Sequence, residues 1–144
     1  MSPRWLFKVK NEANNKIRRK SRLVARGFAD SNFYDIDETY APVAGLVDIR
    51  FLIATANKFD LNIYHLDVKT AFLNGKLEKK VYMKVPEGLG EWLGKDKNFD
   101  QDYILELLKS IYGLKVSPKR WFVRFDKAMK KLRFSSYPFQ PCYI

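Results

Sequence analysis

The stretch HLDVKTAFLNG, residues 65–75, contains one acidic residue, Asp67, whose place needs a chemical explanation. Asp67 ends an apolar run that is typical of a buried strand, and a small residue and an aromatic one, Ala71 and Phe72, follow shortly after it. An ionised carboxylate in such a place is costly unless hydrogen bonds or a cation neutralise it. Two interpretations stay open here: a structural aspartate satisfied by hydrogen bonds, or an oxygen ligand for a divalent metal ion.

Basic residues gather toward the two ends of the chain, which carries a net charge of +11. Residues 1–28 and residues 109–133 each hold nine Lys or Arg against one acidic residue, and the segment between them is acidic overall. This distribution is typical of two surfaces that bind a polyanion around a site that needs carboxylates. Two solvated faces of a basic protein would give the same pattern.

The composition argues against several other kinds of site. His65 is the single histidine and Cys142 the single cysteine, so neither zinc catalysis nor a disulfide framework is supported. The sequence has no Gly-x-x-x-x-Gly-Lys-Ser/Thr loop for binding nucleoside phosphates. From the single cysteine we expect a reducing compartment. The sequence also lacks an apolar run of about 18 residues and an apolar leader, so we expect no membrane span and no secretory signal.

The first 28 residues predict a β-hairpin. Residues 5–9 alternate between apolar and other side chains, residues 11–15 form a turn cluster, and residues 16–28 predict the second strand. Period-two geometry places one set of cations on a single face of that strand: Arg18, Lys20, Arg22 and Arg26. This face suits contact with phosphates, and it would equally serve as an exposed edge kept soluble by charge.

The rest of the chain predicts a mixed α+β fold in one domain. Loops are expected at residues 29–43 and 88–102, strands at 61–68, 81–85 and 103–111, and a helix at 47–59. A last helix is predicted to begin with Ser117 as N-cap and Pro118 in its first turn. Its expected buried stripe consists of Trp121, Phe125, Ala128, Met129 and Leu132.

Four blocks in this order resemble one family. They are RLVARGF (residues 22–28), DETYAPVAGL (37–46), HLDVKTAFLNGKLEKKVYMKVPEG (65–88) and LLKSIYGLKVSPKRW (107–121). Together they resemble the reverse transcriptase of Ty1/copia-type LTR retrotransposon Pol polyproteins, from about residue 5 to residue 143. The resemblance implies a fingers β-hairpin plus an incomplete polymerase palm with packed helices. Residues 1–60 would be fingers-like, and residues 61–144 would begin the palm and include a helix that returns to the fingers.

The resemblance also implies a chemistry, which is RNA-directed DNA synthesis by nucleotidyl transfer with two divalent metal ions. Asp67 matches the first metal-binding aspartate, and Mg²⁺ would be the cofactor of the intact parent enzyme. A deoxynucleoside triphosphate would be bound by Lys20, Arg22, Val68, Phe72, Tyr112, Gly113 and Lys115. An RNA/DNA primer-template would be bound by Arg18, Arg26, Lys119, Arg120 and Arg124. In this family the Phe72 ring would lie under the sugar and exclude a 2′-hydroxyl.

The sequence departs from the family pattern in places. It ends at Ile144, before the Tyr-x-Asp-Asp hairpin that carries the second carboxylate pair, and the other regions of the polyprotein are missing. Gly45 stands where an arginine is usual, and Val116 where a polar residue is usual. We therefore expect a fragment that is inactive alone. The resemblance implies an intracellular location, which is the cytoplasm or a virus-like particle for the parent element, with the nucleus as an alternative. A non-catalytic nucleic-acid-binding module and a non-functional transposon relic remain as alternatives.

Overall fold

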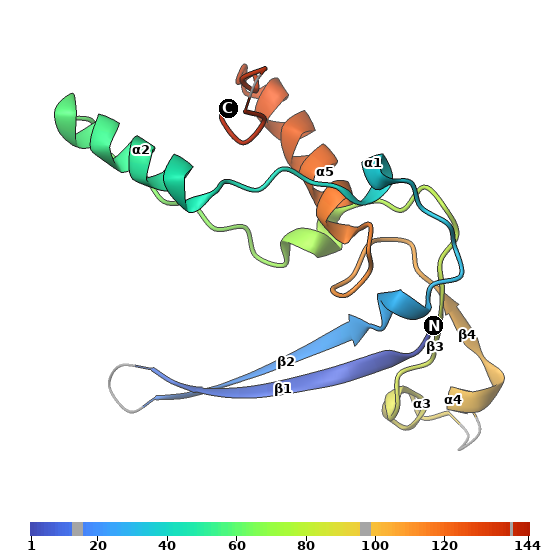
Figure 1. Cartoon of the computed structure of the whole chain (residues 1–144). Coiled ribbons are helices and arrows are strands. Elements are labelled where there is room, and N and C mark those ends of the chain that lie inside the picture. The colour runs from blue at the N-terminus through green and yellow to red at the C-terminus, as the bar shows by residue number, and fades with distance from the viewer. Residues whose placement is uncertain (13–15, 96–98, 139) are drawn as a thin grey trace.

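The computed structural model describes residues 1–12, 16–95, 99–138 and 140–144. It contains two small antiparallel sheets and several helices, which confirms the α+β class (Figure 1). In the described part of the chain, no helix is both long enough and apolar enough to cross a membrane.

The predicted N-terminal hairpin is confirmed. β1 (Pro3–Asn11) pairs with β2 (Ile17–Ala25), in a register that runs from Pro3 opposite Ala25 to Asn11 opposite Ile17. The hairpin extends away from the rest of the molecule (Figure 1). β2 ends earlier than predicted because a 3₁₀ turn, η1 (Gly27–Ala29), follows it. The predicted turn at residues 11–15 falls largely on residues 13–15, which lie outside the described residues.

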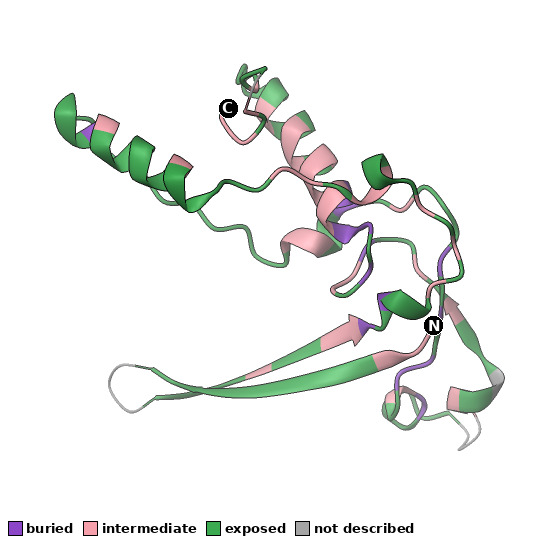
Figure 2. Cartoon of the chain, in the orientation of Figure 1, coloured by how far each residue is buried: buried purple, intermediate pink, exposed green. Residues whose placement is uncertain are grey.

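The expected loop at residues 29–43 begins at the last residue of η1 and contains a one-turn helix, α1 (Ile36–Thr39). The helix expected at residues 47–59 is confirmed as α2 (Leu46–Lys58). Its first turn is held by the Asp48 carboxylate, which accepts a hydrogen bond from the Gly45 N–H (2.7 Å). Most of α2 is exposed, and Ala56 is its buried residue (Figure 2).

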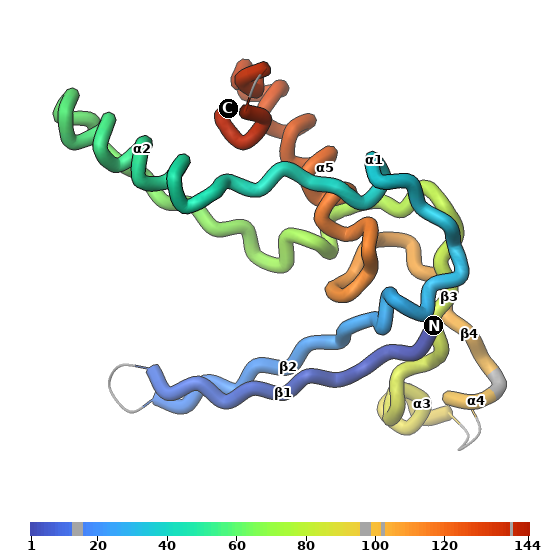
Figure 3. Tube along the Cα trace, in the orientation of Figure 1, coloured from blue at the N-terminus to red at the C-terminus, as the bar shows by residue number. Residues whose placement is uncertain are grey.

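The strand predicted at residues 61–68 is wrong. The segment leads from the end of α2 toward η2 (Ala71–Asn74), a short 3₁₀ turn, without forming a strand (Figure 3). Every residue from 61 to 70 is exposed, Asp67 included, so the expectation of a buried strand fails with it. Alternating apolar residues favour an extended backbone, but a strand needs a hydrogen-bonded neighbour, and none pairs with this segment among the described residues.

A second sheet forms further along the chain. β3 (Tyr82–Lys84) confirms the strand predicted at residues 81–85, and it pairs antiparallel with β4 (Ile104–Glu106). The expected loop between them holds two one-turn helices, α3 (Leu89–Trp92) and α4 (Phe99–Asp102), and residues 96–98 of that loop lie outside the described residues. The predicted strand 103–111 is thus much shorter than expected.

The core lies where the base of the hairpin, β3 and the residues before the last helix meet. Its buried members are Ala25, Val81, Met83, Leu114 and Val116. Figure 2 shows buried positions in this region, whereas the far end of the hairpin is exposed. The core therefore fixes the hairpin base against the segment that precedes the last helix.

The last helix, α5 (Ser117–Lys131), is confirmed with corrections. Its N-cap is Val116, because Ser117 lies inside the first turn and donates its hydroxyl to the Ile111 carbonyl oxygen (2.5 Å). The apolar stripe is only partly covered: Ala128 and Leu132 are exposed and the other three members are half-buried. Few elements pack against α5, since η2 and α1 are its main neighbours.

Candidate functional site

Two glycines bring the hairpin base against the loop at residues 111–114. The Ala25 N–H donates a hydrogen bond to the Tyr112 carbonyl oxygen (2.8 Å). Gly113 adopts a φ of +94°, and a Cβ there would collide with the Ala25 carbonyl oxygen. A Cβ at Gly27 would in turn collide with the Gly113 carbonyl oxygen. Both the turn and the close backbone approach therefore depend on glycine.

Three of the predicted nucleotide-binding residues meet beside this junction, although they come from three separate segments. The rings of Phe72, from η2, and Tyr112 pack edge to face with their centroids 5.1 Å apart. The Arg22 guanidinium, from β2, lies 5.8 Å from the centre of the Tyr112 ring. Such a ring pair contributes about 0.5–1.5 kcal/mol beyond the area it buries, and an exposed cation–π contact about 0.5–1 kcal/mol. The result is a platform of two rings with a cation beside it, called here the ring platform.

Sequence reasoning missed Ser110, which lies two residues before Tyr112. Its side chain has no exposed surface, and its hydroxyl donates a hydrogen bond to the Phe72 carbonyl oxygen. Its N–H donates to the Gly75 carbonyl oxygen (2.8 Å). A Cβ at Gly75 would lie 2.7 Å from the Ser110 Oγ. No local pattern signals this role, because the partners lie some 35–38 positions away in the sequence.

Cations cover one face of the hairpin, as predicted. Lys20 stands opposite Lys8, Arg18 opposite Lys10, and Arg22 opposite Leu6. Like charges directly opposite one another destabilise a strand pair. Of the cations on this face, Arg18 has an ion pair in the described part of the chain, with Glu12 at 3.2 Å. We call this surface the basic face.

Arg26 does not belong to the basic face, which corrects the prediction. β2 ends at Ala25, and Arg26 precedes the 3₁₀ turn η1, where the alternation of a strand no longer applies. Its backbone N–H donates to the Ser2 carbonyl oxygen (3.0 Å). The Arg26 side chain is nevertheless exposed, so it stays accessible to a ligand.

Asp67 and Val68 lie on the exposed segment that leads into η2. Thr70 turns the chain between this segment and η2 with a φ of +52°, a conformation that a β-branched residue rarely adopts. In the described part of the chain, no three His, Cys, Asp or Glu side chains lie close enough to hold a metal ion together. The exposed carboxylate of Asp67 nevertheless fits Mg²⁺ in kind, because that ion is commonly held by one or two carboxylates plus substrate phosphates.

Arg120 does not face solvent, which contradicts the expectation of an accessible cation at this position. Only 8 % of its surface is exposed, and its guanidinium forms ion pairs with Glu78 and, at 4.0 Å, with Glu38. It lies three positions after the buried Ser117 and therefore on the same side of α5. By contrast, Lys119 is half-buried and Arg124 is exposed, as is Lys115 in the preceding loop.

Polar contacts link α1 with the chain that precedes β3. The Lys79 ammonium lies 2.9 Å from the Glu38 carboxylate, and its hydrogen bond is the main cause that lowers the pKa of Glu38. Nearby, the Tyr34 hydroxyl donates to Asp30 (2.7 Å). Burial, followed by this hydrogen bond, raises the pKa of Tyr34 to about 12. These contacts hold the framework and do not touch the ring platform.

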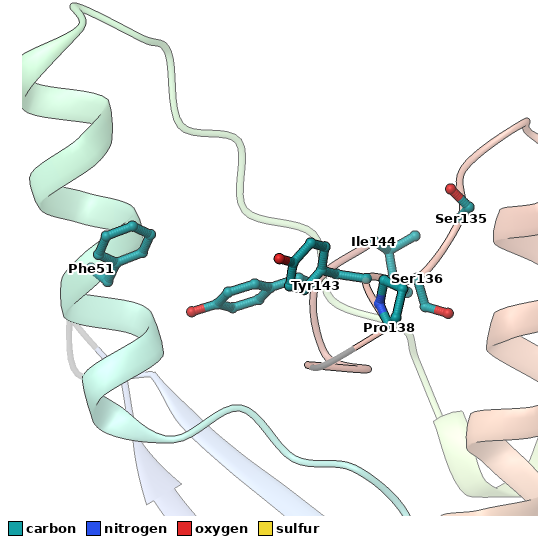
Figure 4. A pocket seen from close by; sticks show the side chains of 7 residues that line it. Phe51, Ser135, Ser136, Pro138, Tyr143 and Ile144 are labelled. Carbon is teal, nitrogen blue, oxygen red and sulfur yellow. The ribbon is translucent and has the colours of Figure 1, made fainter.

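A separate hollow lies between α2 and the C-terminal segment (Figure 4). It has a volume of about 580 Å³ and is lined by Phe51, Ser135, Ser136, Tyr137, Pro138, Tyr143 and Ile144. The Tyr143 hydroxyl (2.9 Å) and the Gln140 amide (3.0 Å) donate to Asp48. With the Gly45 N–H as the largest cause, these bonds lower the pKa of Asp48. None of the predicted site residues lines this hollow.

The sequence comparisons define the class of this protein. The profile of the reverse transcriptase (RNA-dependent DNA polymerase) family matches residues 1–141, and the chain belongs to that family. This finding confirms the resemblance that the four sequence blocks indicated.

Its curated relatives are Pol polyproteins of Ty1/copia-type transposons. The chain is 40% identical over 140 residues to the Retrovirus-related Pol polyprotein from transposon TNT 1-94 of Nicotiana tabacum, a match that covers 96% of this chain and 10% of the relative. The Retrovirus-related Pol polyprotein from transposon RE2 of Arabidopsis thaliana is 39% identical, and the match covers 83% of this chain and 8% of the relative. The one from transposon RE1 of the same plant is 35% identical, and the match covers 91% of this chain and 9% of the relative. The chain thus spans about a tenth of these relatives. No solved structure matches it.

Proposed function

We propose that this chain forms the nucleotide-facing part of an RNA-directed DNA polymerase, with residues 1–60 as fingers and residues 61–144 as the beginning of the palm. The observation that carries the proposal is the ring platform, in which Arg22, Phe72 and Tyr112 converge from distant segments. Family membership adds the reaction class, because the matching profile describes an RNA-dependent DNA polymerase. The ligands would be a deoxynucleoside triphosphate and an RNA/DNA primer-template.

In this proposal, the basic face and the ring platform divide the nucleotide between them. Arg22 and Lys20 bind the triphosphate, Arg22 as a planar fork and Lys20 as a point charge. The Phe72 ring lies under the sugar, where it leaves no room for a 2′-hydroxyl. Tyr112 and Gly113, with Lys115 beside them, position the nucleotide against the templating base. Because the Ala25 N–H is hydrogen-bonded to the Tyr112 carbonyl oxygen, the basic face and the ring platform keep a fixed position relative to one another.

Further cations would bind the phosphates of the primer-template. The exposed residues available for this are Arg18, Arg26 and Arg124, together with the half-buried Lys119. Each neutralised phosphate releases counterions, so binding would weaken as salt rises. Arg120 is excluded from this set because it is buried in ion pairs.

Asp67 would supply one carboxylate oxygen to Mg²⁺, with Val68 beside it near the triphosphate. The chemistry that Mg²⁺ would supply there is activation of the primer hydroxyl and stabilisation of the leaving pyrophosphate. Asp67 is exposed, so its carboxylate is accessible to a metal ion that arrives with a nucleotide. A second carboxylate pair belongs to the family's Tyr-x-Asp-Asp segment, which this sequence does not contain.

A direct test is primer extension with Mg²⁺. We expect no extension by this chain alone, and extension once a segment that bears the Asp-Asp hairpin is supplied. Template-dependent incorporation by the chain itself would contradict the inactive-fragment part of the proposal. The alternative of a non-catalytic binding module is favoured by the like charges that face one another on the basic face, and it predicts duplex binding without any restored extension.

A second test addresses nucleotide binding and uses a matched pair of variants. Arg22→Ala removes the cation beside Tyr112, and Arg19→Ala removes the same charge from the opposite face of β2. We expect Arg22→Ala to weaken binding of the magnesium complex of dATP roughly tenfold, which corresponds to one lost charge-assisted contact. Arg19→Ala should change it little, as measured by NMR titration. Equal losses would show that net charge alone attracts the nucleotide.

A further inference from the structure

We propose that Ser110 is a positioning residue, which holds Phe72 against Tyr112 and so sets how strictly the site rejects a ribonucleotide. This inference rests on the proposed function, since it concerns the sugar that Phe72 would face. Ser110 touches neither nucleotide nor metal in this proposal. It acts on the backbone of η2, through a hydroxyl bonded to the Phe72 carbonyl oxygen and an N–H bonded to Gly75.

The turn η2 needs such an external contact. It is a 3₁₀ turn of four residues, closed by hydrogen bonds from the Leu73 N–H to Thr70 (2.9 Å) and from the Gly75 N–H to Phe72 (3.2 Å). A single turn fixes many dihedral angles for few hydrogen bonds, so it is unstable by itself. Its entry residue Thr70 is left-handed, which adds backbone strain to the turn. Contacts from outside the turn must offset both terms.

Ser110 is placed so that water cannot take over its role. The side chain is fully buried, and Gly75 packs so tightly beside it that even a methyl group at position 75 would lie 2.7 Å from the Oγ. Removal of the hydroxyl would leave the Phe72 carbonyl oxygen with the longer bond to the Gly75 N–H alone. That one bond holds the peptide after Phe72 less firmly, so we expect the peptide to rotate more and the Phe72 ring to move with it.

The loop that carries Ser110 also carries the other ring. Tyr112 lies two residues further on, and its carbonyl oxygen is fixed by the Ala25 N–H. One loop therefore holds Tyr112 directly and Phe72 through the Ser110 hydroxyl, which sets the 5.1 Å separation of the two rings. A ring that excludes a 2′-hydroxyl by contact must be held to within about 0.5 Å. The separation of the two rings therefore decides how strongly a ribonucleotide is rejected.

The experiment compares four variants of the chain with the wild type: Ser110→Ala, Phe72→Ala, the double variant, and Tyr34→Phe. The last removes a half-buried hydroxyl that bonds Asp30, away from the ring platform, and serves as the matched control. One measurement is the nuclear Overhauser effect between the Phe72 and Tyr112 ring protons. The other is the ratio of the dissociation constants of the magnesium complexes of ATP and dATP, from NMR titrations.

We expect the wild type to prefer dATP, and Ser110→Ala to reduce this preference several-fold and to weaken the ring-to-ring signal. Tyr34→Phe should leave both unchanged. In the Phe72→Ala background, a further Ser110→Ala change should not alter the ratio, because Ser110 acts through the ring that is already gone. If Ser110→Ala does not fold, Ser110→Cys fills the site with a slightly larger group that is a weaker donor, and a smaller loss in the same direction is expected.

Three results would overturn the proposal. They are an unchanged ring-to-ring signal in a folded Ser110 variant, an unchanged nucleotide preference there, or an effect of equal size in the Phe72→Ala background. A wild type that binds neither nucleotide, or both equally, would instead refute the proposed nucleotide site. The ring-to-ring signal would still decide whether Ser110 positions Phe72, so the two failures are distinguishable.

Discussion

Replacement of Gly113 by alanine should release the hairpin from the body of the protein. The new Cβ would have to occupy the space of the Ala25 carbonyl oxygen, and the backbone would have to keep a φ of +94°. The conformational part alone costs about 1–2 kcal/mol for a residue with a Cβ. Relief of the collision would break the bond from the Ala25 N–H to Tyr112, which adds about 1 kcal/mol.

Gly88 offers a matched control for the conformational part. Its φ is +80°, but a Cβ there would meet nothing within 4 Å. Gly88→Ala should therefore lower the free energy of unfolding by about 1–2 kcal/mol, and Gly113→Ala by about 2–3 kcal/mol once the lost bond is added. For a chain of this size, 1 kcal/mol corresponds to a shift of about 2–4 °C in Tm, which circular dichroism resolves.

Hydrogen exchange of the Ala25 amide distinguishes the mechanism from a general loss of stability. This amide should be protected in the wild type and in Gly88→Ala, and it should exchange rapidly in Gly113→Ala at temperatures where all three chains are folded. Equal Tm losses in the two variants, together with a protected Ala25 amide in Gly113→Ala, would refute the reasoning that the glycine serves the close backbone approach.

Further predictions concern the framework and the basic surfaces. Glu78→Ala should lower the free energy of unfolding by about 1–3 kcal/mol, measured by urea denaturation, because it leaves the buried Arg120 with Glu38 alone at 4.0 Å; a loss below 0.5 kcal/mol or so, as for an exposed pair, would contradict this. Because Lys79 lowers the pKa of Glu38, the stability from that contact is present above the ordinary value of 4.5 and is lost as the pH falls through the lower folded-state value. The acid-side fall in Tm should therefore be flatter in Glu38→Gln, and identical pH profiles would disprove it. Binding to an RNA–DNA duplex should weaken steeply with salt, and a log-log slope near zero would remove the phosphate contacts.

Local patterns predicted the elements whose pattern and packing agree. Alternation at residues 5–9 and a second strand at residues 16–28 predicted the hairpin, and helical spacing located α2 and α5. The segment 61–68 has an equally clear pattern but lacks a neighbouring strand among the described residues. Its preference for an extended backbone therefore did not lead to a hydrogen-bonded strand. The apolar stripe of α5 failed for a similar reason, since the sequence cannot say how many elements will cover a helix.

The candidate site was predictable in its residue types and less so in its geometry. Arg22, Phe72 and Tyr112 were selected from sequence blocks, and the structure brings them together. Arg120 was assigned to contact with nucleic-acid phosphates because it lies among the cations of the last helix, although its spacing from Ser117 placed it on the packed side. Ser110 escaped notice because its importance comes from a carbonyl 38 positions away, which no local pattern records.

The row of like charges across the hairpin has a thermodynamic consequence. Lys8 against Lys20 and Lys10 against Arg18 repel one another most when the strands are paired, so strand pairing and anion occupancy are linked equilibria. A bound polyanion removes the repulsion and stabilises the paired strands by the same free energy that the pairing adds to its affinity. We therefore expect strand pairing far from the hairpin base to weaken in dilute buffer and to strengthen when nucleic acid binds. The degree of strand pairing would then report on binding.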